Sequence, residues 1–276
     1  MIIPLGELIQ KGFKLYRDNF IVLLQYLLLT VAPMVVFFLI AAPIYWSGQY
    51  LDLLGNLVLL LIIIPLALLI GFLLFLLSLW FNFNLMRAVH TVYLGKKAKP
   101  LKESLKESIK VLWPGLGTTI LAGLYITGPL LVAGVLGLLL NLVFAGNTFI
   151  GIFVMLLFIY AFVHAFYFSI RLVFAVYESV LNNVNIKESI ASSQKLTNGR
   201  WLEVFFGLLV PALIVWIGLM ILNFVIMGLT SLLGNTGELV AGLISYIISF
   251  LVTPLTMAYV IILFVEAKKN PAKPKA

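Results

Sequence analysis

Four polar residues stand out because they fall inside otherwise apolar stretches. His164 and Arg171 are seven residues apart, which places them near one helix face, with Glu178 a further heptad along. Asn82 and Asn84 lie near the end of another apolar stretch. Ionisable groups inside a membrane are costly, and polar side chains there bond between helices or line a path for protons and solutes. His164, Asn82, Asn84 and Arg171 therefore form the candidate intramembrane polar site.

Depth decides between a proton relay and a structural role for these groups. Counted from Phe149, about 20 residues cross the hydrocarbon, so Arg171 can reach the head groups while His164 stays buried. We expect a neutral His164 that is hydrogen-bonded inside the helix bundle. A proton or substrate role for His164 is the alternative.

Signatures of catalysis and of cofactor binding are missing from the sequence. It contains two histidines, His90 and His164, and no cysteine, which excludes thiolate metal ligands, disulfides and a cysteine nucleophile. It also has no glycine-rich phosphate loop, nucleophile elbow or intramembrane pair of carboxylates. We therefore expect no enzyme activity, no metal and no cofactor.

The elements that position the polar residues follow from the composition. Of the 276 residues, 63% are hydrophobic and 10% are charged, whereas a soluble domain has about 45–50% apolar and about 25% charged residues. The chain cannot cover a water-facing surface and must lie in a lipid bilayer. Its net charge of +8 then reflects membrane topology and anionic lipid head groups rather than nucleic acid.

Six apolar stretches are long enough to cross a bilayer, since each crossing needs about 20 residues. The longest uncharged run must hold two crossings, and it divides at Asn141 to Thr148, where Gly146 and Asn147 favour a turn. The fold class is therefore an all-α polytopic membrane protein. The predicted helices cover residues 20–45, 57–84, 116–141, 149–175, 203–230 and 239–265.

The charges predict the orientation independently of hydropathy. Every Lys and Arg lies at or beyond the same ends of these helices, whereas the three opposite connections carry only Asp52 and Glu238. Because positive residues are retained in the cytoplasm, we expect a multi-pass protein of a plasma (inner) membrane with both termini cytoplasmic. Residues 267–276 are expected to form a disordered basic tail.

Three segments share the pattern aliphatic, x, Glu, x, aliphatic, x, x, small, x, Lys, aliphatic, beginning at Leu5, Leu101 and Ile186. Their apolar residues recur every three to four positions, which predicts amphipathic helices lying flat at the cytoplasmic interface. We predict one transmembrane domain, residues 1–266, of three parallel repeats that each hold an interfacial helix and a transmembrane hairpin. The repeat units are about 4–95, 100–184 and 185–266, and Asn185 is expected to cap the third interfacial helix, with Glu188 as its capping-box partner. The expected contacts with anionic phospholipid head groups are Lys11, Lys14, Lys102, Lys106, Lys110, Lys187, Lys195 and Arg200.

The segment from Arg171 to Trp201 resembles a known family. Its residues Ser193, Leu196, Thr197, Gly199 and Arg200 are similar to a signature in the membrane domain of bacterial glycerophosphoryl diester phosphodiesterases and its stand-alone relatives of unknown function. The resemblance implies a six-helix bacterial inner-membrane protein and brings no activity with it. The catalytic domain is a barrel of about 250 residues, and no connection between the predicted helices can hold it.

Together these features favour a non-enzymatic lipid- or envelope-associated scaffold or accessory protein. The alternative is a small-solute or lipid transporter with a path along the axis of the three repeats. Beyond the lipid bilayer, no partner is implied.

Overall fold

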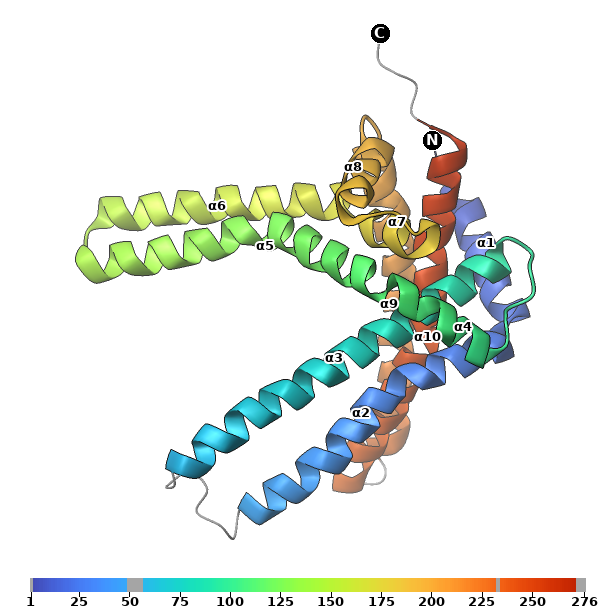
Figure 1. Cartoon of the computed structure of the whole chain (residues 1–276), viewed down its shortest axis with the longest axis horizontal. Coiled ribbons are helices and arrows are strands. Elements are labelled where there is room, and N and C mark those ends of the chain that lie inside the picture. Colours follow the sequence, from blue (N-terminus) through green and yellow to red (C-terminus); the bar gives the residue numbers. More distant parts are fainter. Residues whose placement is uncertain (1, 49–56, 232–233, 272–276) are drawn as a thin grey trace. The chain divides into compact units, whose positions relative to one another are not determined.

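A computed structural model describes residues 2–48, 57–231 and 234–271 (Figure 1). Asp52 and residues 272–276 of the predicted tail lie outside these ranges. Every regular element in the described ranges is a helix, as expected for the all-α class. The longer helices are α2 (Phe20–Gly48), α3 (Leu57–Tyr93), α5 (Leu112–Val143), α6 (Thr148–Arg171), α9 (Trp201–Thr230) and α10 (Asn235–Lys269). The short ones are α1 (Leu5–Asp18), α4 (Leu101–Ser108), the 3-10 turn η1 (Ile109–Val111), α7 (Ala175–Asn182) and α8 (Ile186–Thr197).

The prediction of six membrane-spanning helices is confirmed. Within the described ranges, six helical segments are long and apolar enough to cross a bilayer. Each segment contains one of the long helices α2, α3, α5, α6, α9 and α10. Some of them run further than predicted: α3 continues to Tyr93, and α10 continues through Lys269 into the predicted tail. The helix of α3 stops where Gly95 adopts a φ of +72°, a conformation that glycine tolerates best.

The predicted helix over 149–175 is interrupted. The amide of Ala175 donates to the carbonyl of Leu172 at 3.0 Å instead of continuing the α-helical pattern with Arg171. The carbonyl of Arg171 accepts the hydroxyl of Ser193 from α8 at 2.9 Å. The predicted extension of the His164 and Arg171 face to Glu178 is therefore wrong, because Glu178 lies on the separate helix α7.

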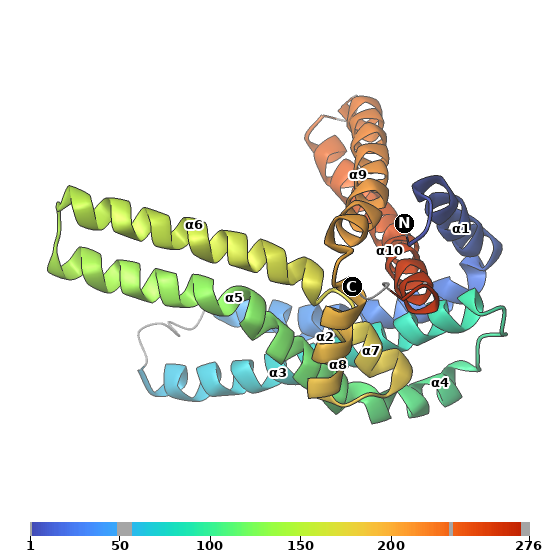
Figure 2. The same ribbon diagram turned by 90° about the horizontal axis from the view of Figure 1, so that it is seen from above.

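The chain forms two compact units, each with its own packing. Unit 1 comprises Met1–Gly12, Trp113–Ile217 and Tyr259–Ala276, and unit 2 comprises Phe13–Leu112 and Gly218–Ala258. In unit 2, α2 and α3 form an antiparallel hairpin, and α4 packs on α3. In unit 1, α7 and α8 lie side by side, and α5 and α6 form a hairpin (Figure 2).

Small side chains determine how closely α5 and α6 approach. A methyl group added at Gly137 would lie 2.9 Å from Cγ1 of Val154, so glycine is needed at this crossing. At the start of α6, the side chain of Asn147 accepts the amides of Phe149 and Ile150, which satisfies two helix-end donors. The expected turn at this position is thus a helix cap.

The three short helices α1, α4 and α8 bury matching positions of the predicted pattern. On α1 and directly after α4, one apolar residue of the predicted amphipathic face stays exposed: Phe13 is 53% exposed and Ile109 is 48% exposed. The packed face carries the small residue of the pattern and the residue four positions before it. These buried residues are Leu8 and Gly12 in α1, Ser104 and Ser108 in α4, and Ser189 and Ser193 in α8. The organisation of the whole chain in three repeats stays a prediction.

The small residue faces a neighbouring long helix. A methyl group added at Gly12 would overlap Cδ1 and Cε1 of Tyr259 in α10. In α4, the Oγ of Ser108 accepts the indole N–H of Trp80 in α3 at 2.9 Å. Glycine and serine thus allow the short helix to lie against the long one.

Replacing Gly12 by alanine should therefore destabilise the protein. Added volume in a packed contact costs about 1–3 kcal/mol, so Gly12→Ala should lower the midpoint of thermal unfolding, followed by circular dichroism in detergent, by about 2–8 °C. Gly6→Ala is the matched control, because a methyl group at Gly6 meets nothing within 4 Å. An unchanged midpoint for Gly12→Ala would contradict the close contact with Tyr259.

Candidate functional site

A buried carboxylate joins three helices of unit 1. Glu178 is 1% exposed, and its oxygens accept hydrogen bonds from Asn182 in α7 at 2.7 Å, Ser192 in α8 at 2.7 Å and Lys268 in α10 at 3.0 Å. Burying a charged group is costly unless it is paired and hydrogen-bonded. These four residues, the Glu178 cluster, satisfy that requirement and hold α7, α8 and α10 together.

Aromatic rings shield one side of the Glu178 cluster. Phe174 and Phe264 are fully buried, and their ring centroids lie 5.6 Å apart. The ring of Tyr177 lies 6.1 Å from that of Phe264. The ammonium of Lys268 stands 5.4 Å from the centroid of Phe264, within cation–π range. This apolar wall excludes water from part of the ion pair, which strengthens it.

The residues after α8 bind the end of α10. Gly199 has a φ of +70°, which turns the chain directly before Arg200. The guanidinium of Arg200 donates to the carbonyls of Ala267, at 3.2 Å, and Asn270. The last carbonyls of a helix lack intrahelical partners and carry partial negative charge. Arg200, which the sequence analysis predicts as a lipid contact, therefore forms hydrogen bonds with the C-terminus of α10.

Arg171 binds protein groups in the same unit. Its guanidinium donates to Oη of Tyr167 at 2.9 Å and to the carbonyl of Gln194 at 3.2 Å, and it lies 5.6 Å from the centroid of the Tyr167 ring. Ser193 donates to the Arg171 carbonyl and accepts the amide of Phe174 at 3.2 Å. Both the side chain and the backbone of Arg171 thus anchor α8.

His164 lies two turns before Arg171 on α6 and has aromatic neighbours. Its ring stacks on Phe168 at a centroid distance of 4.4 Å and lies 6.3 Å from the ring of Tyr160. The Nδ1 atom is buried, and no described residue forms a hydrogen bond with it. The described partners of His164 are thus aromatic rings, and the hydrogen bonds of Arg171 go to Tyr167 and Gln194 instead.

The two asparagines have different environments in unit 2. Asn84 is fully buried, and its Oδ1 accepts the hydroxyl of Ser104 from α4 at 2.6 Å. Asn82 donates to the carbonyl of Ser78 in its own helix at 2.8 Å. Asn84 is therefore the one of this pair that joins two helices.

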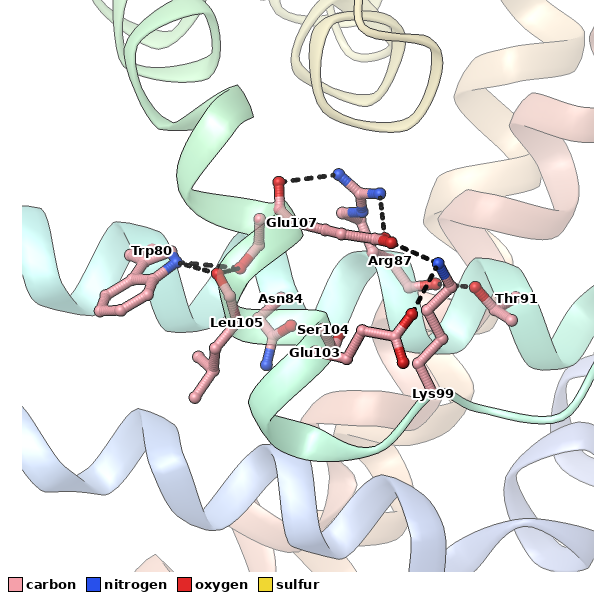
Figure 3. A network of polar contacts seen from close by, with 10 residues as sticks. Trp80, Asn84, Arg87, Thr91, Lys99, Glu103, Ser104, Leu105 and Glu107 are labelled. Atoms are coloured by element: carbon pink, nitrogen blue, oxygen red, sulfur yellow. Dashed lines mark hydrogen bonds and ion pairs between the residues drawn. The ribbon is translucent and has the colours of Figure 1, made fainter.

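A polar network extends the contact between α3 and α4 (Figure 3). Arg87 pairs with Glu107 at 3.1 Å, and Lys99 binds both Glu107 and, at 3.6 Å, Glu103. The hydrogen bond that Lys99 donates to Glu107 is the main cause that raises the pKa of Lys99 above its ordinary value. We call these four residues, with Asn84, Ser104, Ser108 and Trp80, the α3–α4 network.

The sequence analysis did not identify the ion pair of Arg87 with Glu107 or the partners of Glu178. The repeated pattern gives no signal for the first, because the residue before the small position differs among the three segments: Lys11, Glu107 and Ser192. The predicted capping of α8 is confirmed: Oδ1 of Asn185 accepts the amide of Glu188 at 2.9 Å. Local patterns therefore predicted the cap but not the contacts between helices.

The basic side chains predicted to contact lipid fall into two groups: some bind other protein groups, and the others are exposed and form no ion pair with a described residue. Lys11 lies 2.8 Å from Glu7 and 3.7 Å from Glu266 in α10, and its pKa is raised chiefly by the hydrogen bond to Glu7. Within the described part of the chain, six other predicted lysines are exposed and form no ion pair. They are Lys14, Lys102, Lys106, Lys110, Lys187 and Lys195.

Removing the charge of Glu178 should loosen the junction of α7, α8 and α10. Glu178→Gln keeps the shape but leaves Lys268 without its anion, and hydrogen bonds to a charged group contribute about 1.5–3 kcal/mol. We expect a lower thermal midpoint of the full-length protein in nanodiscs. Glu103→Gln, which removes an exposed carboxylate, is the control and should change stability by less than about 1 kcal/mol. Equal effects of the two substitutions would contradict the role of the Glu178 cluster.

Comparison with known proteins agrees with this anatomy. Residues 147–267 match the family described as the membrane domain of glycerophosphoryl diester phosphodiesterase. No curated protein and no solved structure matches the chain. The matched range contains Ser193, Thr197 and Arg200, whose hydrogen bonds join helices, and Gly199, whose positive φ turns the chain before Arg200. The resemblance seen in the sequence is confirmed: residues 147–267 are similar to the membrane domain of glycerophosphoryl diester phosphodiesterase.

Proposed function

We propose that this integral membrane protein is a non-enzymatic lipid- or envelope-associated scaffold or accessory protein of a bacterial inner membrane. The observation that carries the proposal is the two-faced construction of the short helices. One face is fixed to a long helix by small and polar residues, and the other presents exposed lysines, which Phe13 accompanies on α1 and Ile109 accompanies next to α4. Such a helix is suited to binding a membrane surface.

Helix α4 and the turn η1 provide the best-defined example. Lys102, Lys106 and Lys110 are exposed and follow one another at intervals of four residues, which places them along one stripe. Next to this stripe, Ile109 and Trp113 are 48% and 65% exposed. Each lysine near an anionic leaflet contributes about 1 kcal/mol of attraction, while the apolar side chains favour insertion at the head-group boundary.

Exposed lysines also occur on the other short helices. Lys14 lies beside the exposed Phe13 on α1, and Lys187 and Lys195 are exposed on α8. The distribution of basic residues supports cytoplasmic termini, since positively charged segments remain on the cytoplasmic side. The proposed membrane surface is accordingly the anionic cytoplasmic leaflet.

Neutralising the lysine stripe of α4 should weaken the preference for anionic lipids. Three lysines supply about 3 kcal/mol near such a surface, so Lys102→Gln/Lys106→Gln/Lys110→Gln should reduce the association of spin-labelled phosphatidylglycerol relative to phosphatidylcholine in reconstituted vesicles. The matched variant with arginine at all three positions keeps the charge and should retain the preference. An unchanged preference in the glutamine variant would refute the proposal for α4.

A transporter is the second candidate, and the buried Nδ1 of His164 favours it. A polar atom without a hydrogen-bond partner among the described residues is unusual inside a protein and can mark a functional position. If the scaffold proposal is right, His164→Phe should keep the stacking with Phe168 and leave growth and solute uptake unchanged. Phe168→Leu is the control for loss of the aromatic contact alone. A transport defect confined to His164→Phe would favour the transporter.

A further inference from the structure

A cavity of about 690 Å³ lies between the first turns of α2 and the loop that joins α3 to α4, within unit 2. Val22 and Tyr26 line it from α2, Asn19 lines it from the position before that helix, and Lys96 and Lys97 line it from the loop. Its size falls in the range of about 300–1,000 Å³ that is typical of ligand sites. The cavity lies beside the α3–α4 network and shares Lys99 with it.

The loop wall of the cavity is held by specific hydrogen bonds. The amide of Gly95 donates to the carbonyl of Val92 at 2.9 Å, and the amide of Lys96 donates to that of Thr91 at 3.1 Å. Further along, the hydroxyl of Tyr26 donates to the carbonyl of Lys99. Because the loop is fixed at both ends, the cavity is formed before any ligand binds, which lowers the entropic cost of binding.

The charges around this cavity favour an anion. Lys96 and Lys97 are exposed and form no ion pair with any described residue, and none of the described lining residues is acidic. The ammonium of Lys99 is instead directed to Glu103 and Glu107. Helix α4 also begins beside the cavity without a side-chain cap, and the first amides of a helix carry partial positive charge.

The remaining walls are apolar, and this limits the class of ligand. Val22, Val92 and Leu101 line the cavity, so the anion is bound next to hydrocarbon. The position, at the ends of membrane-spanning helices, is that of lipid head groups. We propose that the cavity binds a phosphate group, supplied by the head group of an anionic phospholipid. The choice of lipid as the source rests on the proposed function, whereas the cavity and its two open lysines do not.

The test measures one tightly held lipid separately from the general lipid preference. Full-length protein is reconstituted in phosphatidylcholine nanodiscs containing phosphatidylglycerol, extracted into detergent and examined by native mass spectrometry. The wild type should retain one phosphatidylglycerol, and Lys96→Gln/Lys97→Gln should lower its retention about tenfold or more, since two lysines are removed. Val22→Trp, which fills the cavity without changing its charge, should have the same effect.

The matched control is Lys106→Gln/Lys110→Gln, which removes two lysines of α4 that do not line the cavity. This variant should keep the retained lipid even where the general preference for anionic lipid falls, so failure of the proposed function and failure of this site are distinguishable. Equal retention in the wild type, Lys96→Gln/Lys97→Gln and Val22→Trp would overturn the site. Binding of inorganic phosphate that depends on Lys96 and Lys97, with no phosphatidylglycerol retained by the wild type, would overturn the lipid as the source and support free phosphate as the bound group.

Discussion

The structure depends on polar contacts at the ends of long helices, because a bilayer supplies no hydrophobic force between apolar helices. Lipid tails are as apolar as leucine, so helices associate through close packing and hydrogen bonds. The outer parts of the long helices show this plainly: Phe149 and Leu239 are 84% and 76% exposed. Near the other ends, Glu178 and Asn84 are fully buried and hydrogen-bonded. The short helices are held where such partners are available.

One position of the three short helices forms a polar contact with another helix in each case, although the residue at that position differs. The residue immediately before the small position of each short helix pairs with a long helix or with α7. Its charge is positive in α1, negative in α4 and absent in α8, and the partner changes to match. A search for identical residues therefore misses this feature, although the geometry is shared. The pairs are Lys11 with Glu266, Glu107 with Arg87, and Ser192 with Glu178.

Hydropathy and cap chemistry made the fold largely predictable, because both act over a few neighbouring residues. The six spans and the cap at Asn185 follow from local patterns. The break between α6 and α7 does not, since Leu172, Val173 and Phe174 contain neither proline nor glycine. It coincides with hydrogen bonds from Ser193, a contact across 22 residues of chain. Without that contact, a continuous helix places Glu178 on the wrong face.

Arginine and lysine have different roles in this protein, and the difference shows which part of the positive charge can face a membrane. Arg87, Arg171 and Arg200 all donate to protein carboxylates or carbonyls, a use that suits the fixed fork of the guanidinium. The exposed lysines of α4 lack ion-pair partners among the described residues. A lysine ammonium on a flexible stem can follow mobile head groups. The net charge therefore overstates the membrane-facing charge, and substituting arginines tests the fold whereas substituting open lysines tests lipid recognition.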